Sequence, residues 1–479
     1  MTIKSAEEYA YALGMIDDAM LFKHLFDPVT LLAAFTERFA KSSGKGVDRR
    51  NGFQFALHSA GELVVASEKS LAGGYRFSPY LENLKIKGRN KFPRLIGIPT
   101  IRDRIVLHQL NRFLANLFPK CVPKSVASTY VRDIAIDLAN RSPDDTWVCG
   151  TDIEAFYDNV LPERLLKALA EKILSWQALR LISRALKTPT VPKNSRRSLR
   201  EGFSPEKGIP QGLAISNILA SIYMQEVDVA MREGRIIYYR YVDDVLMYGR
   251  RDDVEKSFHS LNDRLKCRGL SLHPLSSRKS FIQPVQKRFG YLGYEFAHPE
   301  ITVRESTVER LLQSIAAMFS GYLHNKARRL EKYKYLDGAR LAEIFLMELN
   351  ERITGAISER QRYGWIAYFG QITDLSLLHR LDATIERFFV RLDDFGNSAP
   401  KGLLRLSRAY FEMKFNSKGG YVRNYDTITS RAEKLEFLIE RGRIGPTEAL
   451  TDEQINDRFD RYRKKVLSNM HSDEGTMYG

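Results

Sequence analysis

Three aspartates in the sequence are of the residue type that metal-dependent chemistry needs. Asp152 ends an apolar run, WVCGTD, while Asp243 and Asp244 interrupt a tyrosine-rich and aliphatic run, RIIYYRYVDDVLMYG. Carboxylates are costly to bury unless cations pair with them. A solvated Asp-Asp turn is the simpler interpretation of the second pair. The apolar and aromatic residues on both of its sides instead predict a turn held on a rigid hairpin.

Hard oxygen ligands on a rigid support suit Mg²⁺. Two such ions about 4 Å apart can clamp the attacking hydroxyl and the leaving phosphate of a nucleotidyl transfer. The three aspartates therefore predict this chemistry, provided that the fold brings them together.

The surrounding segments predict an α+β unit with an antiparallel sheet. Strand and helix patterns alternate between residues 147 and 285 in the order β–α–β–β–α–β, with the acidic turn between the second and third strands. Apolar residues at helical spacing predict helices within residues 5–40 and 101–118. Further along the chain we expect residues 303–395 to be almost wholly helical, residues 396–425 to be rich in loops, and residues 426–470 to be helical with a break at 442–454.

The order of short motifs resembles that of a known family. The motifs are KGRNKFPRLIGIPTIRDR (87–104), TDIEAFYDNV (151–160), GIPQGLAISN (208–217), YVDD (241–244) and FGYLGYEF (289–296). They resemble the successive fingers and palm motifs of bacterial reverse transcriptases related to group II intron proteins. No Cys/His endonuclease motif or RNase H pattern follows them. The resemblance is therefore to the stand-alone, defence-associated enzymes of the abortive-infection and unknown groups.

This resemblance implies a right-hand polymerase fold of the α+β class. It divides the chain into an N-terminal helical region (1–50), fingers and palm (51–300), a helical thumb (301–395) and a C-terminal extension (396–479) for which the sequence offers no chemistry. In the expected thumb, basic residues and tyrosines suit a face that follows phosphates; they are Arg328, Arg329, Lys332 and Lys334 with Tyr322, Tyr333 and Tyr335. A solvated amphipathic helix is the alternative.

The resemblance also assigns roles to residues of the catalytic site. Asp152, Asp243 and Asp244 would be catalytic and would ligate two Mg²⁺ ions, for which Mn²⁺ could substitute, with the backbone carbonyl of Ile153 completing one shell. Tyr157 would be the steric gate against a ribose 2′-hydroxyl, with its neighbour Phe156 as the alternative. The other expected nucleotide-binding residues are Lys87, with Lys91 as its alternative, Arg94 and Gln211.

A second set would position the primer and template. Gly212 would let the backbone approach closely. Tyr291, Leu292 and Gly293 would form a primer grip, with an aromatic hairpin in the core as the alternative. Lys279 matches the basic residue of the following motif, at a longer spacing than is usual.

Composition agrees with a nucleic-acid partner. The 479 residues carry 74 Lys plus Arg against 58 Asp plus Glu, a formal charge of +16 that favours a polyanion. We therefore expect an RNA template, a DNA product and deoxynucleoside triphosphates, with a dedicated noncoding RNA as a further partner. The three cysteines form no CxxC pair, and neither a signal peptide nor a long apolar segment is found, which favours the cytoplasm and no membrane. The oligomeric state, including a homo-oligomer, is left open.

The leading hypothesis is an RNA-directed DNA polymerase in bacterial antiphage defence. One alternative is a group II maturase-like protein in which RNA binding matters as much as synthesis. Untemplated or protein-primed DNA synthesis of the abortive-infection type is another. A catalytically idle RNA-binding scaffold is a third, and the three retained aspartates argue against it.

Overall fold

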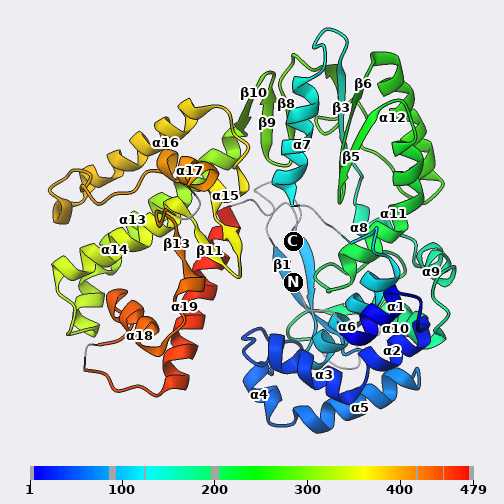
Figure 1. Cartoon of the computed structure of the whole chain (residues 1–479), viewed down its shortest axis with the longest axis horizontal. Helices are drawn as coiled ribbons and strands as arrows, with labels where there is room; N and C mark the ends of the chain where they lie inside the picture. Colours follow the sequence, from blue (N-terminus) through cyan, green and yellow to red (C-terminus); the bar gives the residue numbers. More distant parts are fainter. Residues whose placement is uncertain are drawn as a thin grey trace. The chain divides into compact units, whose positions relative to one another are not determined.

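The computed structural model describes residues 5–85, 93–122, 126–195, 203, 205–416, 419–445 and 447–473. The chain divides into two compact units (Figure 1). The first comprises residues 1–124 and 145–283, and the second comprises residues 125–144 and 284–479. The two units are described separately.

A helical layer built around α6 (Ile101–Leu117) forms much of the first unit's core. Pro99 precedes this helix, and the Thr100 hydroxyl caps it by accepting from the Asp103 backbone N–H at 3.3 Å. Apolar side chains on most of its faces are fully buried, so neighbouring helices surround it. These are α1 (Ala6–Ala12), α2 (Asp18–Leu25), α3 (Pro28–Ala34), the π-helix η1 (Phe35–Phe39), α4 (Gly52–Ala56), α5 (Ser59–Leu71) and α11 (Ser216–Arg232). Two more helices, α9 (Pro162–Ala170) and α10 (Trp176–Lys187), pack against each other and against α11 and α5, respectively.

Two sheets complete the first unit. A small sheet has the order β2–β1–β4, from β2 (Arg94–Ile98), β1 (Tyr80–Lys85) and β4 (Thr190–Val191). The larger sheet has the order β5–β6–β3–β7, from β5 (Ile237–Tyr241), β6 (Asp244–Gly249), β3 (Trp147–Asp152) and β7 (Phe281–Pro284). β6 pairs antiparallel with both β5 and β3, and residues 245–248 in it are at most 1% exposed. The predicted rigid apolar hairpin and antiparallel sheet are therefore confirmed.

Helices pack beside this larger sheet and connect its strands. α11 (Ser216–Arg232) precedes β5, and α12 (Arg251–Lys266) follows β6 and lies along the sheet in Figure 1. The short helix α8 (Phe156–Asn159) follows β3 directly. Because β3 and β6 pair antiparallel, the end of β3 and the β5–β6 turn meet at one edge of the sheet.

The second unit is mostly helical and contains two further small sheets. Its first sheet has the order β10–β9–β8, from β8 (Phe289–Tyr291), β9 (Tyr294–Ala297) and β10 (Glu300–Val303). Its second has the order β12–β11–β13, from β11 (Ala356–Ser358), β12 (Gln361–Tyr363) and β13 (Arg423–Asn424). Its helices are α7 (Ala127–Ala139), α13 (Glu305–Lys332), α14 (Gly338–Thr354), α15 (Trp365–Tyr368), α16 (Leu375–Phe388), η3 (Phe389–Arg391), η4 (Asp393–Phe395), α17 (Leu406–Phe415), η5 (Tyr425–Thr427), α18 (Arg431–Glu440) and α19 (Asp452–Asp473).

The predicted α+β class is confirmed, with two local corrections. The hairpin β11–β12 interrupts the stretch expected to be almost wholly helical, because Gly355 ends α14 at φ 76° and Glu359 and Arg360 turn the chain at φ 53° and 60°. The loop-rich stretch contains α17, whose Tyr410 is buried. The expected break between helices after residue 441 is confirmed. None of the helices in the described ranges is both long and apolar enough to span a bilayer.

Candidate active site

The three aspartates meet at one edge of the larger sheet. Asp152 is the last residue of β3 and pairs in register with Asp244, the first residue of β6. Asp243 lies in the turn before Asp244, and its carbonyl accepts the Ile153 backbone N–H at 2.9 Å. Ile153 also forms an antiparallel bridge with Leu272 and is 2% exposed. Strand pairing therefore gathers all four residues of the predicted metal set at one place.

The turn that carries Asp243 has an unusual backbone. Tyr241 pairs with Asp244, so only Val242 and Asp243 connect the two strands. Val242 has φ 60°, in the left-handed region that β-branched residues rarely adopt. Such a conformation costs on the order of 1–3 kcal/mol and persists where the surroundings fix it.

Arg240 is the residue that fixes this turn. Its Nη1 donates to the Val242 carbonyl at 2.7 Å, while its Nε and Nη2 donate to the two carboxylate oxygens of Asp228 at 2.8 and 2.5 Å. Asp228 lies on α11 and also accepts from the Tyr238 hydroxyl at 3.0 Å. Sequence reasoning missed this network, although an arginine within an otherwise apolar and aromatic strand is a signal for it.

The charges around Asp152 indicate a site that attracts cations. Burial raises the pKa of Asp152, but the hydrogen bond with Asp244 and the nearby ammonium of Lys279 outweigh it and hold the pKa below its ordinary value. Lys279 Nζ lies 3.4 Å from Asp152 Oδ2 and 3.0 Å from His273 Nε2. Lys279 thus lies beside the acids, and its expected role toward the primer and template stays a prediction.

The carboxylates of Asp152 and Asp244 are chemically suited to bind a divalent cation. Two carboxyl groups in direct contact must share a proton or gain a cation between them, because adjacent like charges disfavour double ionisation. Asp152 and Asp244 form such a contact. Within the described ranges, no three acidic, histidine or cysteine side chains already converge as a complete metal cluster. The pair of carboxylates is therefore the part of the site that the fold forms by itself.

Tyr157 and Phe156 differ in their surroundings. Phe156 is 2% exposed and belongs to the hydrophobic core, whereas the half-buried Tyr157 donates its hydroxyl to Asn217 Oδ1 at 2.7 Å. Burial and the charge of Asp243 raise the pKa of Tyr157 to about 12, against the opposing charges of Arg94 and others. Of the two candidates for the gate, Tyr157 is the one near both the acids and the expected triphosphate contacts.

The Pro-Gln-Gly loop is bonded to the strand that carries Arg94. The Gly97 N–H donates to the Gln211 carbonyl at 2.8 Å, and a Cβ on Gly212, which has φ 97°, would lie 2.6 Å from the Ile96 side chain. The Gln211 side chain donates to Asp158 at 3.4 Å. Arg94 has a buried Nε without an acceptor in the described structure. Lys87 and Lys91 lie outside the described residues.

The expected primer-grip residues lie in the second unit. Tyr291 ends β8 and is 3% exposed, Leu292 is fully buried, and Leu292 and Gly293 form a two-residue turn with φ 51° and 84°. The Tyr368 hydroxyl donates to the Leu292 carbonyl at 3.3 Å. This packing agrees with the aromatic-hairpin interpretation and leaves the gripping role a prediction.

Comparisons with known proteins find a family match over the part of the chain that contains this site. Residues 86–296 match the model of the family described as reverse transcriptase (RNA-dependent DNA polymerase). Protein YkfC of Escherichia coli strain K12 is 25% identical over 297 residues, which are 52% of this chain and 74% of that protein.

Two telomerase structures are also similar, at low scores. Apo telomerase from Candida tropicalis, truncated from its C-terminal domain, has a TM-score of 0.37 at 13% identity, over 52% of this chain and 60% of that one. Telomerase from Candida albicans with a fragment of telomeric RNA has a TM-score of 0.40 at 11% identity, over 72% of this chain and 68% of that one. This chain thus spans less than two thirds of the first structure.

The matched range contains Asp152, Asp243 and Asp244, the strands that gather them, and the Pro-Gln-Gly loop. The chain therefore carries a reverse transcriptase domain over residues 86–296.

Proposed function

We propose that this domain adds deoxynucleotides to a 3′-hydroxyl at the site formed by Asp152, Asp243 and Asp244. The observation that carries the proposal is the cross-strand contact of Asp152 and Asp244 at the end of a buried hairpin. A carboxylate pair at this position suits two Mg²⁺ ions, or Mn²⁺ in their place, with Ile153 contributing its carbonyl. When bound, such ions lower the pKa of the primer hydroxyl and neutralise the triphosphate.

The chain's own residues would hold and orient the reactants. Arg240 fixes the backbone of the turn, and therefore the direction in which the Asp243 and Asp244 carboxylates project. Lys279 balances the charge of Asp152 when cations are absent, so the acids need not rearrange before binding. A preorganised site of this kind avoids reorganisation during the reaction.

The incoming nucleotide would bind between the loop and β2. Arg94 offers a guanidinium with a buried, unsatisfied Nε–H, a geometry suited to a triphosphate, and Lys87 would add a second positive charge. Tyr157, anchored by Asn217, would occupy the space of a ribose 2′-hydroxyl and so favour deoxynucleotides. Gln211 would contact the nucleotide or template next to it.

Further assignments rest on the resemblance and on the fold. Gly212, together with Tyr291, Leu292 and Gly293, would position the primer and template, and α13 with α14 would form the thumb. The boundaries at residues 50, 300 and 395 are part of this proposal. The cytoplasm is proposed as its location on the basis of cysteine usage.

The first experiment measures DNA synthesis by the purified protein with its co-purified nucleic acid, labelled deoxynucleotides and Mg²⁺. The test variant is Asp243→Ala/Asp244→Ala. The matched control is Asp252→Ala/Asp253→Ala, another adjacent acidic pair in the first turn of α12. We expect wild type and control to make DNA complementary to a discrete RNA, and the test variant to make none.

Other results would reject parts of the proposal. Random or homopolymeric product would replace templated synthesis with the untemplated activity of the abortive-infection type. Specific RNA binding without any product would favour a maturase-like or scaffold role. Equal synthesis by the test variant would remove the aspartates from the reaction.

An antiphage role with a dedicated noncoding RNA extends the proposal, and it rests on the resemblance alone. It is tested by plating phage on cells that carry the wild-type gene, the Asp243→Ala/Asp244→Ala variant or the Asp252→Ala/Asp253→Ala control. Protection that disappears only in the first variant supports defence by DNA synthesis. Equal plating on all strains across a phage panel would overturn it.

A further inference from the structure

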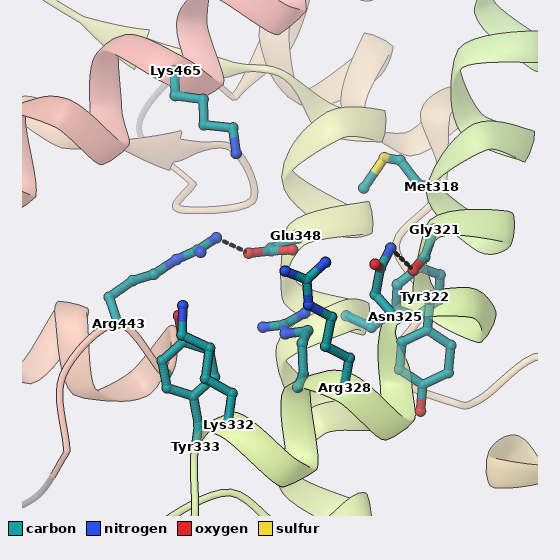
Figure 2. Close-up of a pocket in the computed structure, with 13 residues that line it drawn as sticks. Met318, Gly321, Tyr322, Asn325, Arg328, Lys332, Tyr333, Glu348, Arg443 and Lys465 are labelled. Carbon is teal, nitrogen blue, oxygen red and sulfur yellow. Dashed lines mark hydrogen bonds and ion pairs between the residues drawn. The ribbon is translucent and has the colours of Figure 1, made fainter.

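A pocket of about 550 Å³ lies within the second unit, outside the polymerase site (Figure 2). Its lining comes from α13, α14, the α18–α19 connection and α19. Lys465 of α19 and Arg443 of the connection point into the same space as Lys332 and Arg328 of α13. The volume is within the roughly 300–1,000 Å³ that small-molecule sites occupy.

The pocket has an excess of positive charge. Five cationic side chains line it, against one acidic side chain, Glu348. Glu348 Oε1 is already paired with Arg443 Nη2 at 2.7 Å. Within the described ranges, none of the other four forms an ion pair with a carboxylate; they are Arg328, Arg329, Lys332 and Lys465. Like charges gathered around one cavity repel each other, so an anion bound there would be stabilised by all of them.

Aromatic groups accompany these cations. Tyr333 is half-buried in the lining, and Lys332 Nζ lies 5.1 Å from the centre of its ring. Tyr322 and Phe345 also contribute to the lining, with ring centres 4.6 Å apart. Tyr322 is held by a 2.6 Å hydrogen bond from its hydroxyl to Asp394. Tyr322 and Phe345 are buried beneath the pocket, so the half-buried ring of Tyr333 is the aromatic group of the lining that a base or sugar could contact.

We propose that this pocket binds the polyphosphate of a nucleotide, either as a free nucleoside triphosphate or as the 5′-triphosphate end of an RNA. A nucleic-acid backbone carries one charge per phosphate along its length. A terminal triphosphate instead concentrates several charges in one place, as the pocket concentrates its cations. Tyr333 would stack on the sugar or base next to the phosphates.

The sequence alone predicted a face that follows phosphates, made of Arg328, Arg329, Lys332 and Lys334 with Tyr322, Tyr333 and Tyr335. Arg443 and Lys465, more than 100 residues further along the chain, add to part of that face and form with it an open pocket that includes the C-terminal extension. The extension would therefore have a binding role that the polymerase motifs do not assign.

The test measures binding by fluorescence anisotropy in EDTA and without deoxynucleotides, so that its outcome is independent of DNA synthesis. The probe is a short labelled RNA with either a 5′-triphosphate or a 5′-hydroxyl. Wild type should bind the triphosphate form roughly tenfold or more tightly, as one or two charge-assisted hydrogen bonds would give. Lys332→Glu/Lys465→Glu should abolish this preference.

Lys334→Glu/Lys464→Glu is the matched control, because both lysines are exposed close neighbours in sequence that do not line the pocket. The control should retain the preference. Competition by unlabelled ATP would identify a free nucleotide as sufficient, while insensitivity to ATP would identify an RNA end. Equal wild-type affinity for both RNAs, or equal loss in the control, would overturn the proposal.

Discussion

Replacing Arg240 with lysine tests whether the strained turn depends on its guanidinium. Arg240 reaches two groups at once, Asp228 through Nε and Nη2 and the Val242 carbonyl through Nη1. Lysine keeps the positive charge beside the buried Asp228 carboxylate but offers a single ammonium. It can therefore balance the charge without holding the Val242 carbonyl.

The expected magnitude follows from these contacts. A hydrogen bond that involves a charged group contributes about 1.5–3 kcal/mol, and the variant loses one or two of three. The free energy of unfolding should fall by roughly 2–4 kcal/mol, which a domain with about 5–15 kcal/mol survives. The rate of DNA synthesis should fall by more than the loss of folded protein explains, because a displacement on the order of 1 Å at a reacting centre costs about 10²-fold in rate.

The assay is DNA synthesis on a primed RNA template, with urea unfolding measured in parallel. Tyr238→Phe is the matched control, since the Tyr238 hydroxyl donates to the same Asp228 carboxylate at 3.0 Å without touching the turn. We expect this control to lose about 1 kcal/mol of stability and to keep its activity. If Arg240→Lys keeps full activity while it loses stability, the turn does not need the guanidinium and the reasoning fails.

Three further predictions concern other parts of the first unit. Tyr157→Ala should relax discrimination against ribonucleotides while Tyr157→Phe keeps it, and unchanged discrimination in the alanine variant would move the gate elsewhere. Gly212→Ala should lower the thermal unfolding temperature and raise the KM for deoxynucleotides, because Gly212 has φ 97° and an added Cβ would lie 2.6 Å from the Ile96 side chain. Gly61→Ala is the control and should change neither quantity, because nothing lies within 4 Å of a Cβ added there. Burial lowers the pKa of the His108 side chain from its ordinary 6.5 to about 4 in the folded protein. Below pH 6.5 the unfolded state therefore takes up a proton that the folded state does not, and the free energy of unfolding falls with pH. Between pH 7 and pH 5 the unfolding free energy should drop by about 2 kcal/mol more in wild type than in His108→Gln, and equal slopes would contradict the assignment.

Local sequence patterns predicted the catalytic edge of the sheet because each of its parts is encoded over a few residues. The apolar run before Asp152 and the apolar flanks of Asp243 and Asp244 are short continuous apolar runs, rich in β-branched and aromatic residues, which are typical of buried strands. Antiparallel pairing then requires the strand ends to meet, which places Asp152 opposite Asp244. The roles of the residues came from the order of the motifs, and they remain predictions until the variants are measured.

The residues that support this edge were not predictable, because their partners are distant in the sequence. Asn217, the partner of the Tyr157 hydroxyl, lies on a different helix 60 residues away. The Arg240 contact with Asp228 depends on how α11 packs beside β5, which no local pattern specifies. The same holds for the β11–β12 hairpin, whose strands have three residues each and too little periodicity to be seen in a helical surrounding.

Net charge is a property that the sequence predicts in total, while its placement in the fold is not predicted. The surplus of +16 predicts a polyanionic partner without locating it. Beside the catalytic aspartates, two cations are balanced, because Arg240 pairs with Asp228 and Lys279 with Asp152. In the pocket of the second unit, Lys332 and Lys465 face a shared cavity and form no ion pair within the described ranges. A balanced cluster is stable as it stands, whereas an unbalanced one gains stability from a bound anion. The charges therefore favour the two proposals made above, cations at the carboxylates of the first unit and a polyphosphate at the cations of the second.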